Sequence, residues 1–94
     1  MKQVDEFAEF LKSARLKAQL TQSQVAEALG YSTAQFISNW ERGISCPPLK
    51  NLRSLASMYK VRPDDLFESI LMVSIQTTEQ SMRREYKNLR SRAR

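Results

Sequence analysis

The chain has 94 residues, of which 41% are hydrophobic and 27% charged, and its formal net charge is +5 at pH 7. A chain of this length predicts one domain with a modest core, and a second domain does not fit. The longest largely apolar run, residues 70–75, is far shorter than the roughly 20 residues that span a bilayer, and acidic residues near the N-terminus argue against a secretory signal peptide. We therefore expect a cytoplasmic protein with no membrane segment.

The first helix is predicted over about Val4–Lys17. Its apolar side chains recur at 4-3-4 spacing, which places them on one buried face: Phe7, Leu11, Ala14 and Ala18. Phe7 and Phe10 are then expected to be core aromatics. The alternative is that they form a site for a partner, but a stripe at helical spacing favours packing.

The second helix is predicted to start near Gln22. Thr21 stands as its N-cap with Gln24 three residues on, a capping box in which each side chain satisfies a free backbone N–H. Val25, Ala26 and Leu29 share one apolar face. Gly30 follows where a left-handed residue would end the helix, so the chain is expected to turn there.

A third helix is predicted directly after this turn. Ser32 precedes Gln35 by three residues, which predicts a second capping box, and Gly43 ends a helix of about ten residues. Its predicted apolar stripe is Thr33, Ile37 and Trp40.

The opposite face of the third helix is polar. At about 100° per residue, the side chains that point away from Ile37 are Gln35, Asn39 and Arg42, flanked by Ala34 and Ser38. Paired amide donors and acceptors can match adenine N6 and N7, and arginine can reach a phosphate or a guanine. Two short capped helices with this outward face predict a helix-turn-helix that binds double-stranded DNA. The alternative is an ordinary solvated polar face.

A loop follows Gly43, and its second proline, Pro48, is predicted to begin the fourth helix. The inward side chains of that helix are expected to be Leu52, Leu55, Ala56 and Tyr59. The single cysteine, Cys46, has no partner for an internal disulfide and no histidine or second cysteine for a zinc site. We expect it to pack within the loop beside Pro47, in a reducing compartment.

The last helix is predicted to start after Pro63, where Asp64 and Asp65 favour its N-terminal dipole, and to run on as one long helix. Leu66, Phe67 and Ile70 are expected to complete the core. Beyond them a repeat of roughly 3.5 residues continues, which predicts self-association through the following side chains: Leu71, Ile75, Thr78, Met82, Tyr86 and Leu89. The alternative, favoured by Thr77 and Thr78 in mid-helix, is a partly disordered tail.

These elements divide the chain into a helix-turn-helix domain over residues 1–70 and a basic helical extension over residues 71–94. The positive charge gathers in the last sixteen residues, on Arg83, Arg84, Lys87, Arg90, Arg92 and Arg94. Such an end could add nonspecific phosphate affinity or simply keep a helix soluble.

The stretch from about Leu11 to Leu66 resembles the Cro-type, lambda repressor-like helix-turn-helix family, also called the XRE family. The resemblance rests on the joint spacing of Arg15, Thr21-Gln22, Val25-Ala26, Gly30, Ile37, Trp40-Glu41-Arg42-Gly43, Pro48 and Leu55-Ala56. It implies an all-α fold of five helices whose third helix enters the major groove, usually as a dimer on a two-fold-related operator. It also implies an ion pair between Arg15 and Glu41, for which the alternative is a plain surface pair.

The resemblance also assigns DNA contacts. The segment from Gly30 to Ile37 is one residue longer than in the shortest family members. The first residue to contact a base could therefore be Thr33, Ala34 or Gln35. The predicted base contacts are Thr33, Ala34, Gln35, Ser38 and Asn39, and the predicted phosphate contacts are Gln22, Arg42, Lys50 and Asn51. For Lys50 and Asn51 the alternative is a solvated helix face, and Gln35 could instead be occupied by its capping box.

Enzyme chemistry is not expected. The chain has no histidine, no spacing that pairs a nucleophile with a base, and only two glycines, each with a helix-ending role. We expect no metal, no cofactor and no small-molecule substrate. Two hypotheses remain: a dimeric, sequence-specific transcriptional regulator, with repression as the expected direction, or a protein-interaction module such as an antitoxin or adaptor that uses its C-terminal helix.

Overall fold

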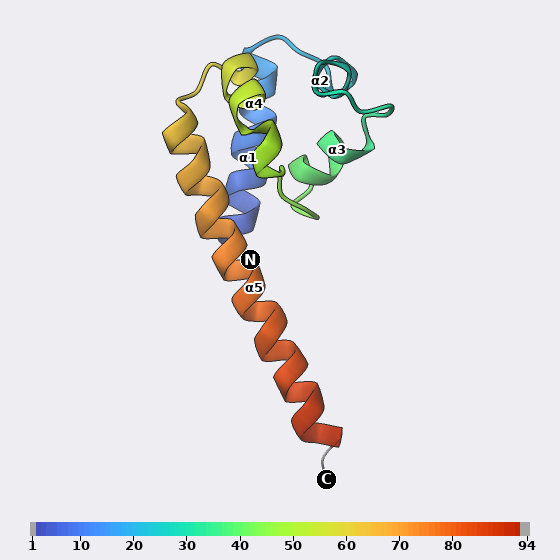
Figure 1. The fold of residues 1–94 in the computed structure, drawn as a ribbon, viewed down its shortest axis with the longest axis vertical. Coiled ribbons are helices and arrows are strands. Elements are labelled where there is room, and N and C mark those ends of the chain that lie inside the picture. The colour runs from blue at the N-terminus through green and yellow to red at the C-terminus, as the bar shows by residue number, and fades with distance from the viewer. Residues whose placement is uncertain (1, 93–94) are drawn as a thin grey trace.

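The computed structural model describes residues 2–92, which form an all-α fold (Figure 1). Its elements in chain order are α1 (Lys2–Lys17), α2 (Gln22–Leu29), α3 (Gln35–Glu41), the short 3-10 helix η1 (Leu49–Asn51), α4 (Leu52–Tyr59) and α5 (Pro63–Arg92). The five α-helices and the long last helix confirm the predicted fold class.

Each of the five α-helices contributes one of the large, fully buried side chains of a single core: Leu11, Val25, Ile37, Leu55 and Leu66. Burying a side chain of this size is worth about 1.5–3 kcal/mol, so the core depends on all five helices together. Phe7 is buried as predicted, but the prediction for Phe10 is wrong because it lies at the edge of the core with 40% of its surface exposed.

The capping box and the terminal glycine that were predicted for α2 are both present. The Thr21 Oγ1 accepts from the Gln24 backbone N–H at 3.0 Å, and the Thr21 N–H donates to Gln24 Oε1 at 2.8 Å. Gly30 closes the helix in the left-handed conformation, at φ 86°. Val25 and Ala26 are buried, and Leu29 packs against the core. These caps fix where α2 begins and ends, and therefore where the chain turns toward α3.

The fourth helix starts later than predicted. Pro48 precedes η1 instead of starting an α-helix, and α4 begins only at Leu52. Leu55, Ala56 and Tyr59 are buried as expected, whereas Leu52 is half-buried. At the other end, Lys60 takes the left-handed conformation that a glycine usually supplies.

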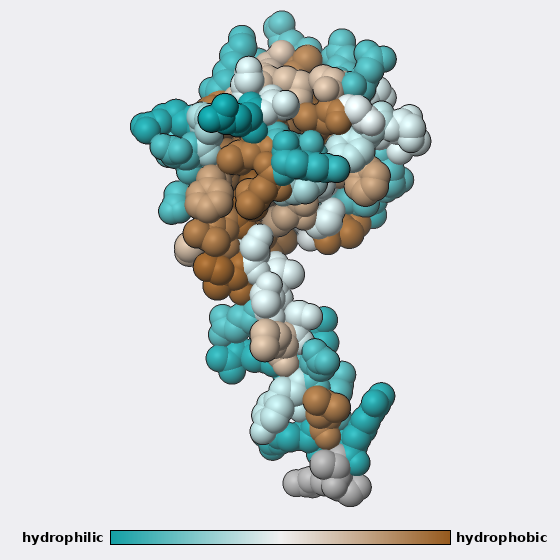
Figure 2. Space-filling model, viewed as in Figure 1, coloured by the Kyte–Doolittle hydropathy of each residue, from teal (hydrophilic) through white to brown (hydrophobic). Residues whose placement is uncertain are grey.

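The first half of α5 packs against α1 and α4, and the second half projects from the domain into solvent (Figure 1). Asp64 and Asp65 lie in its first turn, and its buried side chains are Leu66, Ile70 and Val73. The core includes Val73, and the prediction for Phe67 is wrong because 38% of its surface is exposed. In the space-filling view, apolar surface extends onto α5 as it leaves the domain, and mainly hydrophilic surface follows (Figure 2).

The projecting half of α5 is helical through Thr77 and Thr78 and on to Arg92. The described part of the predicted long helix is thus continuous, and the last two residues, including Arg94, lie outside the described residues. Among residues 2–92, no helix combines the length and the apolar character that a bilayer span requires.

Candidate nucleic-acid interface

Helix α3 is held from behind by two of the most buried side chains in the protein. Ile37 has 0% and Trp40 2% of its surface exposed, and the Trp40 ring meets the Tyr31 ring edge-on at a centroid distance of 6.0 Å. Because both anchors lie on one side of a helix of seven residues, the orientation of its other side is fixed.

The side of α3 away from these anchors presents amides. The Gln35 side chain is exposed and that of Asn39 is half-buried, and Gln35 Nε2 donates to Asn39 Oδ1 at 2.9 Å. This bond joins residues one helical turn apart and uses one Gln35 amide hydrogen and the Asn39 carbonyl oxygen, so the Gln35 carbonyl oxygen and the Asn39 amide group belong to one paired unit. That combination of acceptor and donor is what the adenine N7 and N6 positions require.

The start of α3 differs from the prediction. No Ser32–Gln35 capping box forms: the N-cap is Ala34, which makes no side-chain cap bond, and the Gln35 N–H donates to Thr33 Oγ1 at 3.3 Å. The helix is therefore shorter than predicted at its N-terminus. Thr33 is exposed instead of lying on the apolar stripe, and Ala34 is partly buried against the core. Gln35 is consequently free of its predicted capping role and is the first helical residue on the outward face.

The end of α3 follows the prediction. Gly43 takes the left-handed conformation at φ 73°, and the Ile44 N–H donates to the Asn39 carbonyl at 2.9 Å. A Cβ on Gly43 would lie 3.3 Å from Val4 Cγ1 on α1, so close approach to α1 is a second reason for glycine here. Arg42, at the C-cap, is exposed beside the amide face.

Phe36 is a surface residue of α3 that the sequence analysis missed. Its side chain is 51% exposed although aromatic, and its ring lies 4.8 Å from that of Tyr31. It follows Gln35 directly and flanks the amide face. The available signal was its position one residue before the buried Ile37, which at helical spacing turns Phe36 out of the core.

Asn51 does not have the exposed side chain that its predicted phosphate contact requires. It is 7% exposed, and its Nδ2 donates to the Tyr31 hydroxyl at 2.6 Å, which ties η1 to the turn before α3. The side chain is committed inside the protein because a buried amide without a partner would be costly. Lys50, its neighbour, is exposed.

A buried polar network joins α3 to the rest of the domain. Arg15 donates from Nε to Glu41 Oε2 at 2.6 Å and from Nη2 to Oε1 at 2.9 Å, and its Nη1 reaches the Leu20 carbonyl at 2.9 Å. The two side chains are only 9% and 3% exposed, so this is no surface pair. The hydrogen bond to Glu41 raises the pKa of Arg15 and outweighs the lowering caused by burial.

Gln22 belongs to this network. Its Nε2 donates to Glu41 Oε1 at 3.0 Å, and the side chain is half-buried. One amide hydrogen is thus used within the protein, so a contact with a phosphate would have to use the other. The network connects the end of α1, the start of α2 and the last residue of α3, and therefore sets the angle between the two helices of the motif.

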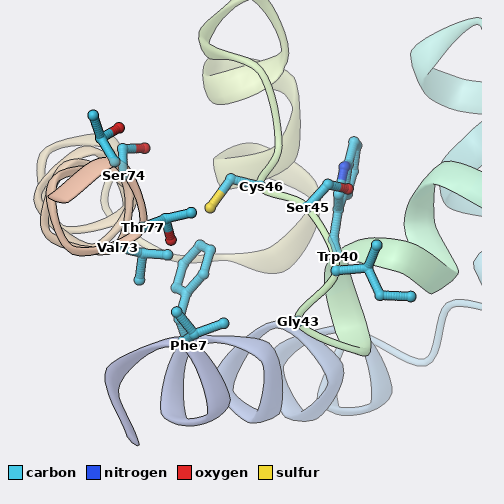
Figure 3. A pocket seen from close by; sticks show the side chains of 11 residues that line it. Phe7, Trp40, Gly43, Ser45, Cys46, Val73, Ser74 and Thr77 are labelled. Atoms are coloured by element: carbon cyan, nitrogen blue, oxygen red, sulfur yellow. The ribbon is translucent and has the colours of Figure 1, made fainter. Parts of the chain in front are cut away.

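A cavity of about 260 Å³ lies behind this region, between α1, α5 and the segment after α3 (Figure 3). The Cys46 sulfur points toward Phe7 and Thr77 across it. Burial raises the pKa of the Cys46 thiol more than its hydrogen bond with Ser74 lowers it, so the thiol stays protonated at neutral pH. The volume is below the roughly 300–1,000 Å³ of typical ligand pockets, and no group of His, Cys, Asp or Glu within residues 2–92 could hold a metal ion.

The comparisons with known proteins agree with this fold. Residues 11–66 match the family model HTH_3, described as Helix-turn-helix, which covers the C-terminal part of α1, all of α2, α3, η1 and α4, and the start of α5. The chain is also similar to the HTH-type transcriptional activator BcrR of Enterococcus faecalis, with 34% identity over 74 residues. That alignment covers 79% of this chain but 36% of the relative, so the chain spans well under half of that protein's length.

Proposed function

Because the chain belongs to the helix-turn-helix family, we propose that it is a sequence-specific DNA-binding transcriptional regulator that places α3 in the major groove. The observation that carries the proposal is the outward pair of Gln35 and Asn39, joined at 2.9 Å on a helix whose other side is fixed by Ile37 and Trp40. A rigid helix that presents paired amides is suited to reading base edges.

The proposed base contacts centre on Gln35 and Asn39, with Ser38 beside them. Thr33 and Ala34 precede the helix and are proposed to contact the edge of the same site. Phe36 is added to the predicted set because an exposed aromatic beside the amides can pack on a thymine methyl group.

The proposed phosphate contacts are Arg42 and Lys50, which are exposed on either side of the loop that follows α3. Gln22 stays in the set through its second amide hydrogen. Asn51 leaves it because its amide is bound to Tyr31. Contacts of this kind hold the protein on the duplex without reading its sequence.

We further propose that the regulator is a cytoplasmic homodimer, because α5 carries exposed apolar side chains where it leaves the domain and most operators have two-fold symmetry. Repression is proposed as the direction of regulation, since a bound domain that overlaps a promoter needs no further contact to block transcription. The relative named above is an activator by name, so a reporter with the selected site placed over or upstream of a promoter is the test of direction.

The exposed side of α5 also supports a second candidate function, a protein-interaction module such as an antitoxin or adaptor in which DNA binding is secondary. Both candidates use the same apolar helix surface, so they differ in α3. Only the first requires the amide face of α3 to contact DNA.

The test is selection of bound sequences from random duplexes at moderate salt, followed by titration of the selected site. Gln35→Ala and Asn39→Ala are each expected to weaken binding by about 5- to 150-fold, the range for losing one bidentate base contact. Asn88→Ala removes an exposed amide on α5 and serves as the matched control, with unchanged affinity expected. A selection without enrichment, or equal affinity for all three variants, would overturn the proposal in favour of the interaction module.

A further inference from the structure

The exposed stripe of α5 consists of Leu71, Ile75, Thr78, Met82, Tyr86 and Leu89. Its five large members are between 39% and 64% exposed. At about 100° per residue, all six lie within a sector of roughly 80° on the helix. The buried Leu66, Ile70 and Val73 lie on nearly the opposite side, so the domain leaves the stripe uncovered along the whole helix.

The two halves of α5 carry opposite charge. Residues 63–78 contain three carboxylates, Asp64, Asp65 and Glu68, and no basic residue. Residues 79–92 contain five lysines and arginines against two glutamates. The helix is therefore an acidic-to-basic rod with an apolar stripe along one side.

We propose that the stripe is covered by the α5 of a second copy of this chain, running antiparallel and centred near Gln80. This inference deepens the proposed homodimer and rests on it. Antiparallel pairing in this register sets Glu68 beside Arg92 of the second copy, whereas parallel pairing sets each charged residue beside its own copy.

Four of the six stripe residues face one another in this register: Leu71 faces Leu89 of the second copy and Thr78 faces Met82. Ile75 faces Glu85, whose aliphatic part can cover it while the carboxylate stays in solvent. The outermost layer brings Glu68 against Arg92, a pair of opposite charges. In parallel pairing the same positions would stack Glu68 on Glu68, Glu85 on Glu85 and Arg92 on Arg92, which like-charge repulsion opposes.

The centre of the proposed interface is already a shallow groove, lined by Ile75, Thr78, Met82 and the aliphatic parts of Glu79 and Arg83. Within one chain, Arg83 Nε donates to Glu79 Oε2 at 3.0 Å. The two copies of Glu79 approach each other near the two-fold axis, and each is paired with Arg83 of its own helix.

This arrangement places both copies of α3 on one side of the dimer. The segment after α3 lies against Ser74 and Thr77 of α5, which are about 110° around the helix from the stripe. A two-fold axis between antiparallel helices is perpendicular to the plane that contains them. The segment after α3 lies roughly a quarter turn around the α5 axis from the interface, so its two copies project on the same side of the dimer. A dimer that binds one face of DNA requires this arrangement.

Cross-linking of the full chain without DNA tests the orientation. Cys46 is first replaced by alanine, and Leu71→Cys and Leu89→Cys chains of different tag length are treated with a short bismaleimide, separately and mixed. Both positions are exposed, so neither substitution touches the core. Antiparallel pairing puts identical positions about 27 Å apart, so only the mixture is expected to form a covalent dimer.

A covalent dimer from either variant alone would show parallel pairing and overturn the proposal. Failure of every sample to cross-link would overturn it too, whether sedimentation shows monomers or dimers that use another surface. As a second measure, Glu68→Arg and Arg92→Glu should each weaken dimerisation severalfold and the double variant should restore it. Because these assays contain no DNA, their failure would not bear on DNA binding, which the α3 titrations test separately.

Discussion

The guanidinium of Arg15 on α1 lies against the carboxylate of Glu41, the last residue of α3, with Nε 2.6 Å from Oε2 and Nη2 2.9 Å from Oε1. This contact spans 26 residues of sequence and is almost fully buried. It fixes the end of the helix that carries the amide face to the longer helix beneath it.

Glu41→Gln is expected to destabilise the domain by about 3–5 kcal/mol, because it leaves the Arg15 charge buried without a counter-ion. Arg62→Gln breaks the exposed pair with Asp65 and should cost at most about 0.5 kcal/mol. Urea unfolding followed by circular dichroism measures both. Equal losses for the two variants would show that the buried pair contributes no more than a surface one.

Tyr31→Phe is expected to cost about 1–3 kcal/mol, because it removes the hydroxyl that accepts from Asn51 and leaves a buried amide unpaired. Ser13→Ala is the control, since Ser13 is exposed on α1 and the protein should tolerate the loss of its hydroxyl. Thermal unfolding at a fixed protein concentration gives the comparison. An unchanged melting temperature for Tyr31→Phe would mean that the Asn51 amide finds another partner.

Gly43→Ala and Gly30→Ala separate backbone strain from crowding. Both glycines have positive φ, so each alanine substitution lowers the free energy of unfolding by about 1–2 kcal/mol, the cost of the left-handed conformation for a residue with a Cβ. Only Gly43→Ala also meets another side chain, Val4 Cγ1 at 3.3 Å, whereas nothing lies within 4 Å of a Cβ on Gly30. We therefore expect the larger loss of unfolding free energy for Gly43→Ala, and the reverse order would contradict the close approach to α1.

Lys50→Ala is expected to reduce the slope of log affinity against log salt by about 0.9 on the selected DNA site, because one phosphate contact is lost. The same substitution at Lys12, on the outward face of α1, should leave the slope unchanged. Binding titrations at four or five salt concentrations measure it. A slope equal to that of the unmodified protein would place Lys50 in solvent instead of on the backbone.

Local signals in the sequence were sufficient for α2. Thr21, Gln24 and Gly30 lie within ten residues of one another, so the cap chemistry that sets both ends of the helix could be read directly. The start of α3 could not be read in this way, because Ser32 and Thr33 offer similar hydroxyls one residue apart and the fold uses Thr33. The same holds for η1, since a proline opens a 3-10 turn as readily as an α-helix.

Residues whose roles depend on distant partners were beyond sequence reasoning. Asn51 looked like a solvated polar residue because its partner, Tyr31, stands 20 positions earlier. Lys60 gave no glycine signal for its left-handed turn. The Arg15–Glu41 pair was expected only from the family resemblance, and its burial, which decides its energetic weight, required the structure.

Thr78 is the last residue of α5 that lines the cavity shared with the domain, and beyond it the helix projects to Arg92. A helical segment of that length is marginal in water unless a packing surface stabilises it. If two chains pair as proposed above, folding of the projecting part of α5 is coupled to dimerisation. Occupancy of a palindromic site would then rise more steeply than in proportion to the number of chains in the cell, and the regulator would sense its own abundance.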